Sequence, residues 1–242
     1  MRWRFRPALV PSLVAAVGFV VLAGLGMWQL GRLRGLEAAR ARYAARLAEA
    51  PFDAAGNEPA DPDRRRAWVE GTPDWDRRMV LPNRYLWGTP GVHWIVPVRA
   101  ASGRTVLVDV GWVPSDEQDA VLARERTMPS PRRFEGLARL PERGRGAARI
   151  GGGGSRWAWA DVPAMRGALG ADGPDVLLVE GEALEPEEEI RDRVPPVGGW
   201  RRTPPERPHG QYALTWFSLA VTLLAAWGSM SFRREETATT SM

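Results

Sequence analysis

Residues 210–232 read GQYALTWFSLAVTLLAAWGSMSF, a run of 23 residues without a charged side chain. The run begins directly after His209 and ends at Arg233 and Arg234. As an α-helix it would extend for roughly 35 Å, enough to cross the hydrocarbon core of a bilayer, which is about 30 Å thick. The sequence therefore predicts a membrane-spanning helix with a histidine at its N-terminal end.

A second uncharged run lies near the N-terminus, at residues 7–31. It shares some features with a cleavable signal peptide, because arginines precede it and small residues lie near Ala23. Its length exceeds the usual ~7–15 residues of a signal core, and it continues through Trp28, an aromatic residue suited to the membrane interface. An uncleaved membrane anchor is therefore the favoured interpretation.

Two spans place both termini on one side of the membrane and leave a polar middle segment long enough to bury one core. Long loops translocate largely regardless of their charge, so the short basic tails favour a cytoplasmic location for both termini. The expected segments are a cytoplasmic tail at 1–7, a transmembrane helix at 8–30, an amphipathic stalk helix at 31–50, an extracytoplasmic domain at 51–209, a transmembrane helix at 210–232 and a cytoplasmic tail at 233–242.

The middle segment contains short runs of strand-forming residues separated by turn residues. In the clearest run Val106, Val108 and Val110 share one face, and the Ser102-Gly103 pair before it predicts a hairpin turn. The runs are Ala67–Glu70, Arg78–Leu81, His93–Arg99, Thr105–Trp112, Phe134–Leu140 and Val176–Glu182.

Two short helices are expected beside these strands. One covers Ser115–Arg126 with Ser115 as its cap, and the other covers Val162–Leu169, between a capping Asp161 and a closing Gly170. Residues 52–66 lack an apolar period and are expected to form a linker. The predicted fold class is a mainly β (α+β) extracytoplasmic domain flanked by two transmembrane α-helices, a barrel being one form of that domain.

The composition argues against several classes of function. The chain has no cysteine, which excludes disulfides, thiolate metal sites and thiol chemistry. All 33 basic residues are arginine and 29 acids offset them, with no basic stripe interleaved with aromatics, so nucleic-acid binding is not expected. No nucleophile elbow or zinc-protease motif is present, so an enzyme is not expected, and the acidic run at 185–189 is interpreted as a solvated face.

The two histidines have different surroundings. His93 lies in a strand run beside Trp94 and is expected to pack at a sheet edge, with its ring satisfied by backbone or water. His209, Tyr212 and Trp216 would share one face of the C-terminal helix, where the imidazole suits an axial ligand to a haem. The alternative is that the two aromatics belong to the interfacial belt and His209 is an interfacial polar residue.

Three sequence motifs lie along the chain, one at each span and one between them. They are GMWQLGR at residues 26–32, VLVDVGWVP at 106–114 and HGQYALTWF at 209–217. Their order and their attachment to the two spans resemble the surfeit-locus family of cytochrome c oxidase assembly factors. The chain departs from the family pattern at Asp109 and Val110, where the family has Asn-Arg, and at Leu36, where it has a basic residue.

The resemblance implies a non-enzymatic membrane protein that binds haem a and assists its delivery to the catalytic subunit of cytochrome c oxidase. It makes His209 the candidate ligand of the haem iron, and Trp28 and Trp216 candidates for one wall of a haem site with Tyr212. Arg32 could pair with a haem propionate, although an arginine just past a span more often reaches lipid phosphate.

Haem a synthase and the lipid bilayer are further expected partners. Arginine-only basicity and the lack of a transit segment favour a bacterial plasma membrane. The alternative function is a structural scaffold that stabilises the oxidase catalytic subunit during assembly without binding haem.

Overall fold

The computed structural model describes residues 2–141, 148–151, 154–181, 193–199 and 208–235. The acidic run at 185–189 and the C-terminal end of the last tail lie outside these residues. The chain divides into two compact units. Residues 1–41 with 205–242 form the helical unit, and residues 42–204 form the domain.

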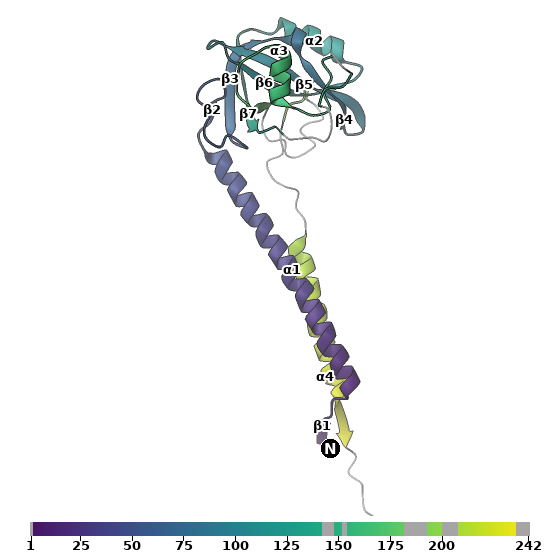
Figure 1. Cartoon of the computed structure of the whole chain (residues 1–242). Helices are drawn as coiled ribbons and strands as arrows, with labels where there is room; N and C mark the ends of the chain where they lie inside the picture. The colour runs from purple at the N-terminus through teal and green to yellow at the C-terminus, as the bar shows by residue number, and fades with distance from the viewer. Residues whose placement is uncertain (1, 142–147, 152–153, 182–192, 200–207, 236–242) are drawn as a thin grey trace, which may run out of the picture. The chain divides into compact units, whose positions relative to one another are not determined.

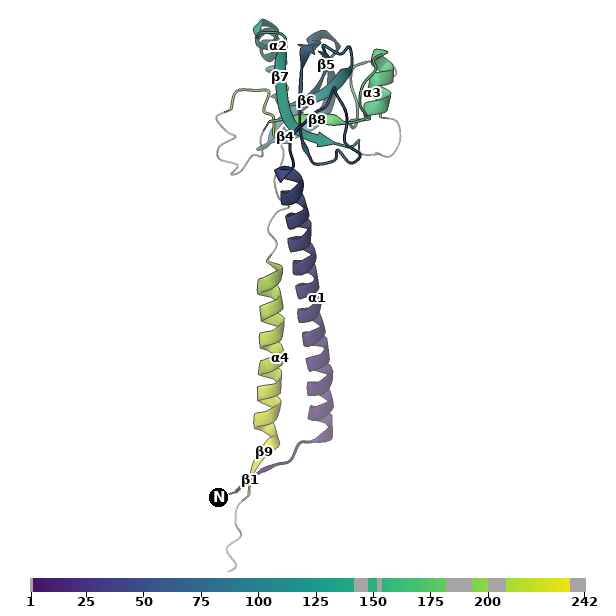
Figure 2. The same ribbon diagram turned by 90° about the vertical axis from the view of Figure 1, so that its left-hand side faces the viewer.

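Two helices dominate the helical unit. Helix α1 covers Leu9–Ala48 and helix α4 covers His209–Ser231, and each is long and apolar enough to cross a membrane. They lie side by side in both views (Figures 1 and 2). They run antiparallel, because Gln29 contacts His209 at one end and Ser12 contacts Trp227 at the other. The molecule is therefore a membrane protein in which two apolar helices flank a β-rich domain.

Close packing of small residues sets the spacing of the two helices. At Gly26 an added Cβ would lie 2.6 Å from the ring of Phe217, so only glycine lets that ring rest on the backbone of α1. Ala15 of α1 and Ala213 and Ala220 of α4 are buried along the same contact. Small residues at a helix–helix contact are typical of membrane helices, where packing rather than the hydrophobic effect holds helices together.

The ends of both helices continue into other structure. Strand β1 (Arg2–Phe5) pairs antiparallel with β9 (Phe232–Glu235) beyond the apolar segments. At the opposite end α1 is continuous, so the expected spanning helix and the expected stalk helix form one helix. Its last turns belong to the domain, where Arg46 pairs with Asp61 and Arg65 pairs with Glu49 at 2.8 Å.

The domain is built on a closed barrel of five strands (Figures 1 and 2). The barrel closes because β3 pairs with both β7 and β5, while β8 joins β7 to β6 and β6 pairs with β5. Its strands are β3 (Arg66–Pro73), β5 (Thr89–Ala100), β6 (Thr105–Pro114), β7 (Arg132–Arg139) and β8 (Leu177–Glu180). Strand β2 (Phe52–Asp53) adds to β3, and β4 (Met79–Leu86) adds to β5.

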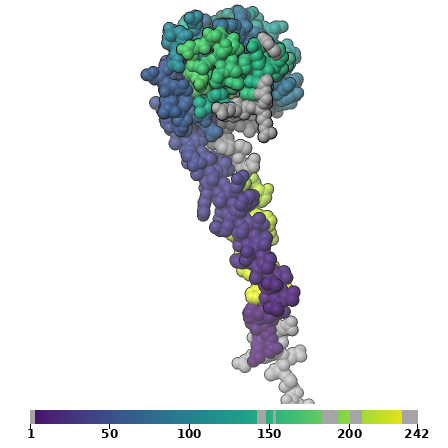
Figure 3. Space-filling view, viewed as in Figure 1, coloured from purple at the N-terminus to yellow at the C-terminus, as the bar shows by residue number. Residues whose placement is uncertain are grey.

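Strand β6 is buried along its whole length because both of its faces are covered. Val106, Val108 and Val110 belong to the larger core cluster, as the alternation of the sequence predicted. Leu107 points the other way, into a second cluster that includes Trp157 and Met165. Helix α3 (Val162–Leu169) supplies part of that second cluster and lies on the outer surface of the domain (Figure 3, green).

The predicted fold class is confirmed, and several local predictions can be compared with the structure. Asp161 accepts the Ala164 N–H at 3.1 Å and starts α3, and Gly170 ends it in a left-handed conformation, both as predicted. The turn between β5 and β6 also forms at Gly103. The cap at Ser115 was wrong: α2 (Gln118–Thr127) begins later, because the backbone N–H of Ser115 bonds Pro90 in the sheet. The expected linker at 52–66 contains the short strand β2.

We expect Phe134→Ala to lower the free energy of unfolding by about 3–5 kcal/mol, because the Phe134 ring is fully buried in the barrel and its removal leaves a cavity. Urea unfolding of the detergent-solubilised protein, followed by tryptophan fluorescence, measures the effect. Tyr85→Ala is the matched control, since that ring is 69% exposed. Equal midpoints for the two variants would contradict a barrel core around Phe134.

Candidate functional site

His209 is the first residue of α4, and its position follows from the local sequence. Pro208 precedes it with φ of −77°, and the Pro208 carbonyl accepts the backbone N–H of Tyr212 in the first helical turn. A proline at the start of a helix loses no hydrogen bond, because the first N–H groups have no partner within the helix. The imidazole is therefore held at the N-terminal end of the apolar helix.

The imidazole contacts the other membrane helix. Nδ1 of His209 lies 2.9 Å from Oε1 of Gln29, and both side chains are partly buried. An amide oxygen can only accept a hydrogen bond, so Nδ1 carries the proton and donates it. The neutral ring then has its lone pair on Nε2, which bonds no described side chain.

Close contacts on both sides of Gln29 hold this pair in register. One turn before it, Gly26 lies under the ring of Phe217, and one turn after it Leu33 lies 3.6 Å from the Cβ position of Gly210. Gly26, Gln29 and Leu33 are spaced at i, i+3 and i+7 and share one face of α1. The hydrogen bond is therefore one contact of a continuous packed seam.

Among the described residues, no hydrogen bond joins the side chains of the other predicted site residues to this pair. Tyr212 is 53% exposed and Trp28 is 58% exposed, so both rings face the surroundings of the helix pair. Trp216 is partly buried and Arg32 is exposed. Gln29 was missed as a site residue by sequence reasoning, although it stands next to Trp28 in the first motif. One signal could have found it: the first motif ends the first span and the third motif begins the second, so two antiparallel spans bring both motifs to the same end.

The arrangement fits a haem in its donor chemistry. A histidine that ligates a metal almost always donates its other ring N–H to an oxygen acceptor, and His209 does so to Gln29. The exposed rings of Tyr212 and Trp28 offer flat apolar surface at the same end of the helices. Within the described residues, no cluster of three or more histidine and acidic side chains offers a separate metal site.

The second histidine is structural. Nδ1 of His93 lies 3.1 Å from both carboxylate oxygens of Asp109, and Oδ1 of Asp109 also accepts the backbone N–H of Gly111. Burial lowers the pKa of His93, but the charge and hydrogen bond of Asp109 outweigh it, so the pKa is raised above its usual value. The ring of His93 is satisfied in the sheet, but the expected edge position was wrong, because β5 has β4 on one side and β6 on the other at this residue. Its partner is a carboxylate on β6 rather than backbone or water.

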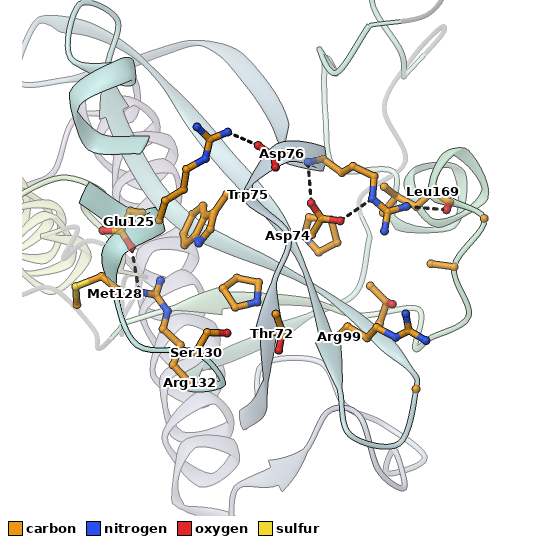
Figure 4. A pocket seen from close by; sticks show the side chains of 18 of the residues that line it. Thr72, Asp74, Trp75, Asp76, Arg99, Glu125, Met128, Ser130, Arg132 and Leu169 are labelled. Atoms are coloured by element: carbon orange, nitrogen blue, oxygen red, sulfur yellow. Dashed lines mark hydrogen bonds and ion pairs between the residues drawn. The ribbon is translucent and has the colours of Figure 1, made fainter. Parts of the chain in front are cut away.

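The domain also has a pocket of about 680 Å³ beside the short helix η1 (Trp75–Arg77), shown in Figure 4. Its charged side chains are largely paired: Arg132 bonds Glu125 at 3.0 Å, and Arg77 bonds Asp74 at 2.6 Å. Arg132 also stacks over the ring of Phe134, 4.5 Å from its centroid. Neither histidine lines the pocket, and its acidic side chains Asp74, Asp76 and Glu125 are held in ion pairs with arginines.

Fold and site together define a class of protein: a β-barrel domain anchored by a pair of apolar helices, with an oriented imidazole at the end of that pair. The model of the SURF1 family matches residues 16–221. A SURF1-like protein from Monosiga brevicollis is 28% identical over 237 residues, which cover 86% of this chain and 82% of that protein. The chain belongs to the SURF1 family, which is linked to cytochrome c oxidase assembly and is known for assembly factors rather than enzymes.

The contact between the spans can be tested by cross-linking, because the chain has no native cysteine. We expect Gln29→Cys combined with His209→Cys to be joined by a short bifunctional thiosulfonate in membranes, since the two side chains meet in the structure. Mass spectrometry of the protease digest detects the linked peptides. Gln29→Cys with Met230→Cys, near the far end of α4, serves as control and should stay unlinked. Linkage of the control alone would place the helices in a different register.

A second test concerns Glu180, whose burial raises its pKa to about 7, with Arg132 opposing and Glu125 and Asp109 adding to the shift. A carboxyl whose pKa is higher in the folded than in the unfolded protein favours the folded state while it is protonated. This contribution is complete at pH values below the pKa of the unfolded state, and it is lost as the pH rises through the folded-state pKa of about 7. Glu180→Gln should therefore match the parent protein at pH ~5 and be more stable by about 1–3 kcal/mol at pH ~8.

Urea midpoints at the two pH values measure this difference. Glu135→Gln is the matched control, because Glu135 is an exposed carboxylate that pairs with Arg133 at the surface. It should change stability by less than about 1 kcal/mol at either pH. A pH-independent effect of Glu180→Gln would show that burial of its charge is not what limits stability.

Proposed function

We propose that this protein is a non-enzymatic assembly factor for cytochrome c oxidase that binds haem a at His209 and assists its delivery to the catalytic subunit. The observation that carries the proposal is the hydrogen bond from His209 Nδ1 to Gln29, which leaves the lone pair of Nε2 without a partner among the described residues, at the end of two apolar helices. The haem is the cargo of this site, and its iron supplies the coordination bond.

The surrounding residues support roles beside the ligand. Tyr212, Trp216 and Trp28 are apolar rings with exposed surface that a flat macrocycle can cover, which removes apolar area from water or headgroups. Arg32 lies one turn from Gln29 on α1 and is exposed, so its guanidinium is placed to pair with a propionate or with lipid phosphate. A ligand at a partly exposed helix end favours release, which delivery requires.

The location follows the same proposal. Both termini lie in the cytoplasm and the domain lies outside a bacterial plasma membrane, since short basic tails flank the two apolar helices. Haem a synthase is the donor that a haem a carrier needs, and the catalytic subunit of the oxidase is the acceptor.

A scaffold that holds the catalytic subunit without haem is the second candidate. The pocket beside η1 favours it, because a cleft rimmed by paired arginines and acids offers polar contacts to a protein segment (Figure 4). In that function His209 contributes only to the packing of the two helices.

Co-expression with a haem a synthesis system, followed by purification and absorption spectroscopy, distinguishes the two functions. We expect the parent protein to carry haem and His209→Ala to retain at most about a tenth of it, since loss of the imidazole removes the proposed iron–nitrogen bond. His93→Gln is the matched control, because His93 is engaged by Asp109, and should keep its haem. A parent protein without haem would favour the scaffold, and equal loading of His209→Ala would dismiss His209 as ligand.

A further inference from the structure

We propose that Gln29 is the positioning residue of the haem ligand: its side-chain oxygen selects the Nδ1–H tautomer of His209 and fixes the plane of the ring, so that Nε2 is presented to the iron. This inference rests on the proposed function. It makes the site a product of both membrane helices, with the ligand on α4 and the group that orients it on α1.

The first step is the direction of the hydrogen bond. Oε1 of Gln29 is an acceptor only, and it lies 2.9 Å from Nδ1, within ordinary hydrogen-bonding distance. A neutral imidazole has one proton, and this contact keeps it on Nδ1. Without an acceptor at this place the ring is free to carry the proton on Nε2, where it would block coordination.

The second step is that Gln29 is itself held. Phe217 on Gly26 and Leu33 beside Gly210 pack the two helices on either side of the Gln29 position. Gln29 is partly buried between these contacts. A partly buried hydrogen bond in a medium of low dielectric is stronger than one in water, and leaving either partner unsatisfied is costly. The amide oxygen therefore stays in one place when the imidazole binds or releases its cargo.

The third step is the consequence for affinity. Removing the group that hydrogen-bonds a metal-ligating histidine typically lowers metal affinity by about 10–100-fold. We expect the haem affinity of Gln29→Leu to fall by the same factor, which would be measured as faster transfer of haem to apomyoglobin. Gln29→Glu keeps an oxygen acceptor of the same reach and should restore slow release.

Two measurements separate this inference from the proposed function. The first needs no haem: with His93→Gln as background, His209 is the only histidine, and nitrogen NMR of labelled histidine reads its tautomer directly. We expect the Nδ1–H form in the background protein and in Gln29→Glu, and a shift toward Nε2–H in Gln29→Leu. An unchanged tautomer in Gln29→Leu would overturn the positioning role.

The second measurement is the rate of haem release from the loaded full-length protein, with resonance Raman of the iron–imidazole bond as its spectroscopic readout. Gln211→Leu is the matched control, because Gln211 is an exposed glutamine close to His209 on α4. It should release haem at the parent rate, while Gln29→Leu releases it faster and with a weaker iron–imidazole bond. Equal rates in both variants would also overturn the inference, whereas a parent protein without haem defeats the proposed function and leaves the NMR result to decide the role of Gln29.

Discussion

A polar pair inside an apolar helix contact is the constraint on which the site depends. Gln29 and His209 are both partly buried where the two helices meet, so each satisfies the other across the contact. This works only in one register, and Phe217 resting on Gly26 sets that register. Gly26 thus lets the two helices approach closely, and the hydrogen bond between Gln29 and His209 forms across this close contact and orients the imidazole ring.

In the barrel domain, two of the buried acidic side chains are paired. Asp109 lies in the fully buried strand β6, and it is satisfied by His93 and by the backbone of Gly111. Glu125 is buried between Arg124 and Arg132, and Arg132 in turn stacks on Phe134. Arginine suits such places because its planar guanidinium can form ion pairs and stack on rings at the same time. Arg124 and Arg132 thus have structural partners within the domain.

These features belong to a member of the SURF1 family, which is linked to cytochrome c oxidase assembly. The described residues bring together one oriented imidazole at the end of the helix pair and, on the domain, a cleft with paired charges. The proposed haem site needs only what a carrier requires: one ligand, an orienting acceptor and apolar surface.

Much of the architecture could be read from the sequence, because it depends on local composition. The uncharged runs determined the two long helices, the alternation of Val106, Val108 and Val110 determined a strand with one face in the core, and Asp161 and Gly170 determined both ends of α3. His209 could be singled out for the same reason. Closure of the barrel through β3 and β5, the carboxylate partner of His93 and the pairing of Gln29 with His209 could not, because each joins residues far apart in the chain. Such contacts depend on strand register and helix packing, and only the tertiary structure decides them.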